Sequence, residues 1–162
     1  MRKDWAIGVI VASIATTATA GHRSSAESIF GEWQRVPALS LSLPGDPGGG
    51  PELYLNLQAR ADTGVHYSVS GRGGDRSTWR VTVDGKFDGH HYPRHGEGVQ
   101  GWMVLTQPSI RTFHDRWFDV GSHRGSETCS LAEAGKKLVC MGYEISLAGK
   151  RFPYRDVYVR LN

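Results

Sequence analysis

The chain has 162 residues and a formal net charge of +3, and 39% of its residues are hydrophobic and 10% aromatic. This hydrophobic and aromatic content, with both charge signs interspersed, excludes an intrinsically disordered chain. The small and scattered net charge gives no basis for nucleic acid as a partner. The length is sufficient for one domain with a single hydrophobic core.

The first twenty residues have the organisation of a secretory signal peptide. Arg2 and Lys3 form a basic start, residues 5–15 are apolar, and residues 18–20 (ATA) are a small-x-small cleavage signature. The apolar run is shorter than the roughly 20 residues needed to span a bilayer, so we expect cleavage and no stable membrane insertion afterwards. We therefore expect residues 1–20 to be a signal peptide and residues 21–162 to be a single domain, exported to the periplasm or the medium.

Beyond the signal, period-two alternation of apolar and polar residues recurs, and no segment sustains apolar residues at helical spacing. We expect strands at residues 53–59, 65–70, 79–84, 102–106, 110–115, 117–120, 127–131, 138–147 and 152–161. Eight to ten short strands joined by tight turns predict an all-β fold, an antiparallel up-and-down β-barrel, because closure removes exposed edges. A two-sheet sandwich is the alternative. Residues 43–51 contain too many glycines and prolines for a strand and are expected to form a loop.

Cys129 and Cys140 are an even pair in a chain expected to be exported, which predicts a disulfide. A hairpin with Ala134 and Gly135 at its turn places the two cysteines directly opposite each other, close enough to bridge. A two-residue turn makes this a hydrogen-bonded pair, the wider kind, and leaves a longer turn open as the alternative.

Two motifs resemble those of a known family. Residues 31–33 (GEW) match the G-x-W motif of calycin barrels, the lipocalins and their relatives, and residues 87–96 (FDGHHYPRHG) resemble the "YDGKDYPVTG" stretch of small bacterial exported lipocalin-like proteins. The likeness runs from about Gly31 to Arg160. It implies a lipocalin-like barrel with a ligand-binding role, in which Trp33 plugs one end and packs against a basic residue of a late strand. The cysteine pair and the histidines of the second motif depart from the family pattern.

Few residues suggest catalysis, and the sequence has no nucleophile elbow, phosphate-binding loop or zinc-finger spacing. We expect no metal and no other cofactor. His91 is a candidate acid–base group, with metal or haem binding and simple exposure on a hairpin loop as the alternatives. On an extended strand His114 and Arg116 share one face, and inside a barrel they would bind an anionic or carbonyl-bearing ligand. The alternative is that Asp115 and Arg116 face solvent.

The aromatic residues complete the predicted site. Seven of them are expected to line the barrel interior or fill its core: Trp79, Trp102, Trp117, Tyr67, Tyr143, Tyr154 and Tyr158. We expect a small apolar or aromatic molecule to bind inside the barrel, oriented by His114 and Arg116. The expected apolar contacts are Tyr67, Trp79, Trp102 and Tyr143.

Two other functions are open at this point. One is a cofactor-independent enzyme, an isomerase, lyase or hydrolase, in which a histidine acts as general base and an Arg or Tyr holds developing negative charge. Its candidate catalytic residues are His114, Arg116 and His91. The other is an interaction module that binds a partner through its loops.

Overall fold

The computed structural model of the chain describes residues 28–41, 52–72, 77–96, 98–121 and 124–161. The predicted signal peptide and the predicted loop at residues 43–51 lie outside these described residues. No helix in the described part of the chain has the length and apolar character needed to cross a membrane.

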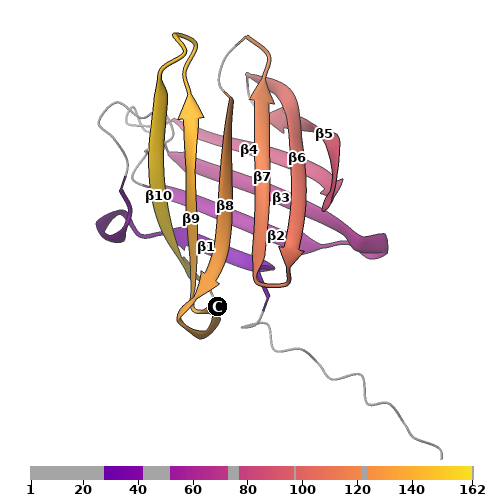
Figure 1. Cartoon of the computed structure of the whole chain (residues 1–162), viewed down its shortest axis with the longest axis vertical. Coiled ribbons are helices and arrows are strands. Elements are labelled where there is room, and N and C mark those ends of the chain that lie inside the picture. The colour runs from indigo at the N-terminus through magenta and orange to yellow at the C-terminus, as the bar shows by residue number, and fades with distance from the viewer. Residues whose placement is uncertain (1–27, 42–51, 73–76, 97, 122–123, 162) are drawn as a thin grey trace, which may run out of the picture.

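Ten antiparallel strands close into one barrel (Figure 1). The strands are β1 (Gly31–Arg35), β2 (Glu52–Ala59), β3 (Gly64–Arg72), β4 (Thr78–Lys86), β5 (Asp88–Gly96), β6 (Val99–Ser109), β7 (Thr112–Asp119), β8 (Arg124–Ala132), β9 (Lys137–Ile145) and β10 (Arg151–Arg160). Each strand pairs with its neighbours in sequence, and β1 pairs with β10 to close the barrel. The predicted up-and-down barrel is therefore confirmed, and the two-sheet sandwich is wrong. Three single-turn 3-10 helices, Pro37–Leu39, Ala61–Thr63 and Glu133–Gly135, complete the described elements.

The strands differ from the prediction in several places, and β1 was not among the expected strands. The two strands expected at residues 110–120 are one continuous strand, β7. The histidine-rich segment, which was not predicted as a strand, forms β5. Its first residues are held by Asp88, whose carboxylate accepts hydrogen bonds from the His90 backbone N–H (3.0 Å) and the Tyr92 hydroxyl (2.7 Å). Gly89 has φ +80°, which favours glycine, and the register of β5 against β6 shifts just after it.

The barrel end that contains β1 is tightly packed around Trp33. The indole Nε1 donates to the Ile29 carbonyl oxygen at 2.9 Å, and the Arg160 guanidinium lies 4.1 Å from the ring centroid. Arg160 also donates to the carbonyl oxygens of Phe30 (2.7 Å) and Ser28 (2.6 Å). Arg160 comes from the last strand, so the expected packing of Trp33 against a late basic residue is confirmed.

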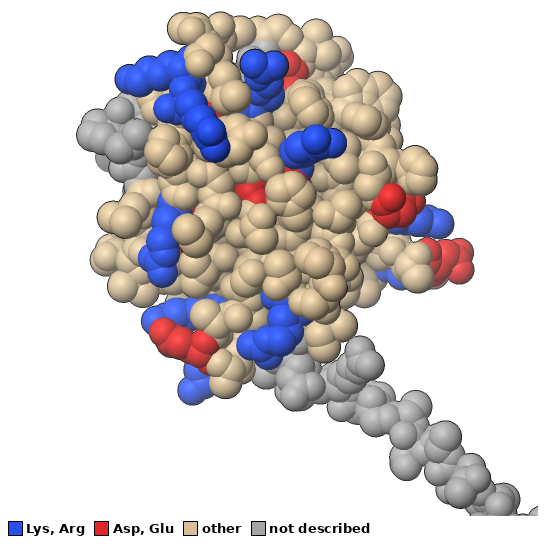
Figure 2. Space-filling model, viewed as in Figure 1, with Lys and Arg blue, Asp and Glu red and all other residues tan. Residues whose placement is uncertain are grey.

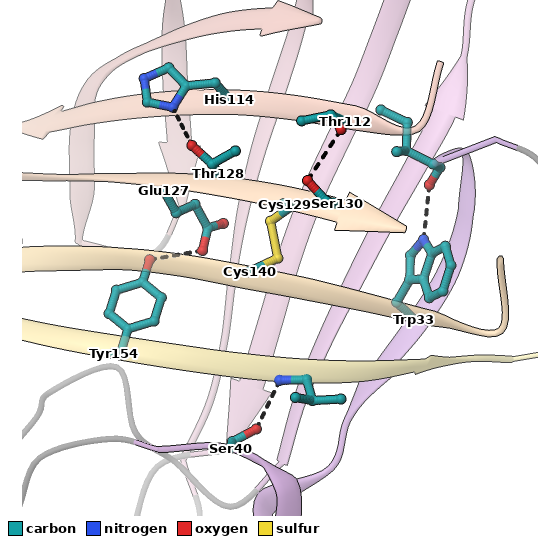
Figure 3. The surroundings of a disulfide bond; sticks show 12 residues. Trp33, Ser40, Thr112, His114, Glu127, Thr128, Cys129, Ser130, Cys140 and Tyr154 are labelled. Atoms are coloured by element: carbon teal, nitrogen blue, oxygen red, sulfur yellow. Dashed lines mark hydrogen bonds between the residues drawn. A yellow bond between two sulfur atoms is a disulfide. The ribbon is translucent and has the colours of Figure 1, made fainter. Parts of the chain in front are cut away.

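The predicted disulfide joins β8 and β9 (Figure 3). Cys129 lies directly opposite Cys140, with Cα atoms 3.9 Å apart. Residues 133–136, including the 3-10 turn, connect the paired strand residues Ala132 and Lys137. The connection is therefore longer than two residues, and a four-residue loop places the cysteines in the closer, non-hydrogen-bonded kind of pair.

The molecular surface carries charges of both signs. On the face shown in Figure 2, the Lys and Arg side chains lie dispersed among uncharged residues, with Asp and Glu side chains between them. Neither sign forms a continuous patch on that face. The arrangement agrees with the scattered charges of the sequence.

Candidate functional site

A cavity of about 100 Å³ lies inside the barrel. Its wall includes Glu127 and Tyr154, which lie on the other side of the disulfide from Trp33 (Figure 3). Every strand except β1 contributes to the wall. The wall residues are Leu53, Leu55, Tyr67, Val69, Trp79, Arg94, Met103, Trp117, Glu127, Glu144, Tyr154, Asp156 and Tyr158.

A pair of buried carboxyl groups lies at this end of the barrel. Asp115 on β7 is directly opposite Glu127 on β8, and their exposed fractions are 0% and 8%. The Tyr154 hydroxyl on β10 donates to Glu127 Oε2 at 2.8 Å (Figure 3). The Asp115 carboxyl group forms its hydrogen bonds with Glu127 and is not part of the cavity wall. The pair is therefore one buried unit, of which Glu127 faces the cavity.

Gly142 on β9 makes the contact between Glu127 and Tyr154 possible. It pairs with Glu127 on one side and with Tyr154 on the other. A Cβ atom at Gly142 would lie 2.4 Å from the Ser126 carbonyl oxygen and 2.6 Å from Glu127 Cβ, closer than real Cβ atoms approach. The missing side chain leaves the space across which Tyr154 reaches Glu127.

Burial controls the protonation of the carboxyl pair. It raises the pKa of Glu127 to about 7, with a further increase from the Asp156 charge and an opposing effect of the Tyr154 hydrogen bond. Burial, followed by the charge of Glu127, also raises the pKa of Asp115 well above its usual value. A protonated Asp115 can donate to Glu127, so the pair retains a proton at neutral pH.

The two cations of the interior already have anionic partners. Arg94 Nη1 donates to Asp119, while its guanidinium carbon lies 5.9 Å from the Trp117 ring centroid. Arg35 Nε donates to Asp156 Oδ1 at 2.6 Å, and both of these side chains are buried. In addition, Arg94 Nε is buried without a hydrogen-bond partner.

Two of the predicted apolar contacts line the cavity and two do not. Tyr67 and Trp79 are in its wall. Trp102 is 48% exposed and belongs to the opposite face of its strand from the buried Met103. Tyr143 lies on the opposite face of β9 from the buried Cys140. On this outer face the guanidinium carbon of Arg151 lies 3.8 Å from the Tyr143 ring centroid. The expected interior position of Trp102 and Tyr143 is therefore wrong.

The expected interior position of His114 and Arg116 is also wrong. On β7 the side chains of Phe113, Asp115 and Trp117 are buried, so the alternate residues face outward. The His114 ring bonds outside the barrel to Thr128 Oγ1 at 3.0 Å (Figure 3). Arg116 is exposed, whereas Asp115, for which exposure was the alternative, is completely buried.

His91 is exposed on β5, and its ring lies 6.3 Å from that of Phe118 on the outer face. No histidine in the described part of the chain lines the cavity. The expected histidine base inside the barrel therefore has no candidate among the described residues.

The sequence reasoning missed Asp115, Glu127 and Arg94. For Asp115 a signal was present, because at period two it shares a strand face with Phe113 and Trp117. In the same way Glu127 shares a face with Cys129 and Leu131. A carboxylate in phase with large apolar residues on a strand is a sign of a buried polar group.

Glu127 also lies beside the disulfide. One ligand atom each of Glu127, Cys129 and Cys140 lie within 4.8 Å of one another, a spacing that would suit a metal ion. The two sulfur atoms are bonded to each other, so neither is a thiolate. In the oxidised protein this set therefore supplies one metal ligand, the Glu127 carboxylate.

Comparison with known proteins identifies no relative, since no protein-family model matches the chain and no curated protein is significantly similar to it. The assignment of the fold therefore rests on the strand pairing. The role of the cavity rests on the chemistry of its wall.

Proposed function

We propose that this protein is an exported, lipocalin-like carrier that binds one small molecule in the cavity beside Glu127. The observation that carries the proposal is the buried Glu127 carboxyl group, which is part of the cavity wall and lies opposite a second buried carboxyl group, Asp115. Burying a carboxyl group without a cationic partner destabilises a fold, and a ligand that hydrogen-bonds to it compensates for that loss.

The lipocalin-like character is supported by the closed antiparallel barrel and by Trp33 packed against Arg160. Export is supported by the organisation of residues 1–20 and by the disulfide, which is stable in oxidising compartments.

The size of the cavity limits the ligand. Ligand pockets usually occupy about 300–1,000 Å³, and an engineered cavity of about 150 Å³ holds benzene. A cavity of about 100 Å³ suits a compact molecule of a few non-hydrogen atoms, or the head of a larger one. Tyr67 and Trp79 supply apolar contacts, as expected from the sequence, while Glu127 and Tyr154 take the orienting role that was assigned to His114 and Arg116.

The test is to purify the exported protein and compare native with denaturing mass spectra under non-reducing conditions. We expect the wild-type protein to release a small molecule. The variant Glu127→Gln should release less of it, whereas Glu52→Gln, a control at an exposed carboxylate on β2, should behave as wild type. Proteins that are empty in all three cases and bind no small probe in solution would contradict the proposal.

A second candidate function is proton transfer in a cofactor-independent enzyme. The specific observation in its favour is that the pKa of Glu127, raised by burial to about 7, suits a general base at neutral pH. Glu127 would take a proton from a carbon next to a carbonyl group, and the unpartnered Arg94 Nε–H would donate to the oxygen of the resulting enolate.

Hydrogen–deuterium exchange tests this second function. In D₂O, wild-type protein should accelerate exchange at the α-carbon of a small ketone such as 3-methyl-2-butanone, and the rate should rise with pH through about 7. Exchange should return to the buffer rate in Glu127→Gln. Exchange by the wild-type protein that is no faster than in buffer would contradict an enzymatic role on carbon acids.

A further inference from the structure

We infer that the cavity selects a compact organic cation, a protonated amine whose ammonium group lies at Glu127 and whose apolar part contacts the aromatic wall. The inference deepens the proposed function and rests on it, because it names the class of molecule that the cavity holds. It follows from the balance of charge, from the aromatic rings and from the Glu127 carboxylate, which come together in the cavity wall.

The balance of charge at the site favours a cation. Arg94 is paired with Asp119, and Arg35 with Asp156. Among the described residues, Glu127 and Asp115 form no salt bridge with any Lys, Arg or His. When Glu127 is ionised, an incoming ammonium group therefore meets a negative charge with which no described cation forms a salt bridge, in a low-dielectric interior where such an attraction is strong.

The hydrogen-bonding capacity of Glu127 matches an ammonium group. Glu127 accepts one hydrogen bond at Oε2 from Tyr154, and an ionised carboxylate has about four acceptor sites. An ammonium group has three donors and no acceptor. Binding would supply hydrogens to the remaining acceptor sites of a buried carboxylate in the cavity wall.

Aromatic rings share the cavity wall with Glu127 and add a second source of selectivity. The rings in the cavity wall are Tyr67, Trp79, Trp117, Tyr154 and Tyr158. The faces of aromatic rings attract cations, by about 0.5–2 kcal/mol for each favourable contact. Ring faces and a carboxylate therefore both attract an ammonium group, whereas both repel an anion.

The rival ligand is an anion held by Arg94. Its Nε–H is unpartnered and buried, which is the one feature of the wall that suits an acceptor. Its positive charge is nevertheless opposed by Asp119, and Arg94 is close enough to Asp115 to lower the pKa of that carboxyl group. An anion beside Arg94 would therefore be repelled by Asp115 and Glu127.

The experiment uses three probes that match in size and shape and differ in charge: isobutylamine, isobutanol and isobutyrate. Each is titrated at pH 8 into the full mature protein, and binding is followed by NMR through the indole N–H signals of the cavity tryptophans. We expect isobutylamine to bind about tenfold or more tightly than isobutanol, and isobutyrate not to bind.

Variants connect this preference to the carboxyl pair. Glu127→Gln should weaken isobutylamine binding about tenfold while leaving isobutanol binding within about threefold of wild type. Glu127→Met, which removes the charge without leaving a buried amide, provides a second test with the same expected direction, should Glu127→Gln fold poorly. The control Glu52→Gln should retain the wild-type preference.

Three results would overturn the inference. Equal binding of amine and alcohol would show that charge does not select the ligand, and tighter binding of isobutyrate would show that Arg94 dominates; both leave the proposed cavity function standing. If none of the three probes alters the cavity signals, both the inference and the proposed carrier function fail.

Discussion

The two ends of the barrel differ in how completely the interior is packed and hydrogen-bonded. Around Trp33 the interior is filled, and the indole N–H and the Arg160 guanidinium both find carbonyl partners. Around Glu127 the interior contains a cavity of about 100 Å³, and the Arg94 Nε–H in its wall finds no hydrogen-bond partner. β10 contributes to both, with Arg160 at the filled end and Tyr154 at the hollow end.

The contrast separates residues that make the fold from residues that the fold does not need. A satisfied and well-packed end stabilises the barrel, while a buried pair of carboxyl groups without a cationic partner destabilises it. The filled end is therefore expected to carry the stability, and the hollow end the function. Substitutions at the two ends should separate these effects.

The largest expected effect is at the filled end. Trp33 is fully buried, so Trp33→Ala should lower the free energy of unfolding by about 3–5 kcal/mol. Trp102→Ala is the matched control, because Trp102 is 48% exposed on the outer face, and its loss should be below about 1 kcal/mol. Urea denaturation followed by circular dichroism measures both. Equal losses would contradict the assignment of Trp33 to a structural plug.

The disulfide between the two ends should have the next largest effect. Replacing both cysteines by alanine (Cys129→Ala with Cys140→Ala) is expected to lower the free energy of unfolding by about 3 kcal/mol, since the bond closes a short loop in the unfolded chain. The m-value should change too, because the unfolded variant is less compact. A variant with wild-type stability would show that the bond contributes nothing to the fold.

The pH dependence of stability tests the hollow end. The pKa of Glu127 is about 7 in the folded protein against an ordinary value of 4.5, so the folded protein binds a proton more tightly than the unfolded chain. The stability contributed by this group is therefore greatest below about pH 4.5 and is lost as the pH rises through about 7, by on the order of 3 kcal/mol. The groups that face it are Asp115, Asp156, Tyr154, Tyr67 and Tyr158.

Chemical denaturation at pH 5 and pH 8 measures this loss. Glu127→Gln should reduce the difference, and the control Glu52→Gln should not. Asp88, whose pKa is lowered to about 2 mainly by the His90 backbone hydrogen bond, acts in the opposite direction but only below about pH 4. Wild-type stability that increases from pH 5 to pH 8 would contradict a buried, proton-retaining Glu127.

The smallest effect is expected at His114. Its ring lies outside the barrel against Thr128, so His114→Ala should leave isobutylamine binding within about twofold of wild type and change stability by less than about 0.5 kcal/mol. This reverses the expectation from the sequence. NMR titration of the variant provides the measurement, and a large loss of affinity would place the binding site on the outer face.

The sequence predicted the barrel and the cysteine pairing because both depend on local pattern, and the Trp33 plug followed from the resemblance of residues 31–33 to the G-x-W motif. Period-two alternation marks strands, and a hairpin register follows from its turn. In the segment that forms β7, the alternation gave two faces correctly but not which one is interior. His114 and Arg116 were placed inside because their side chains could bind a ligand. Phe113 and Trp117 are more apolar, so their face of β7 is buried, and Asp115 is buried because it lies on that face.

The cavity itself could not be predicted for a different reason. It brings together Arg94, Glu127 and Tyr154 from three strands, and their proximity depends on the closure and stagger of the whole barrel. The role of Gly142 is equally invisible in the sequence, because it depends on which residues lie beside it on β8 and β10. The positions of strands can be predicted from the sequence pattern, whereas contacts across the barrel depend on how the whole sheet is assembled.

The most direct test of the account is to measure stability and binding together in Glu127→Gln at pH 8. The account predicts that the variant unfolds at a higher urea concentration than wild type, because a buried charge has been removed, and that it loses the preference for isobutylamine over isobutanol. A variant that is less stable than wild type and keeps that preference would show that Glu127 supports the fold and does not hold a ligand.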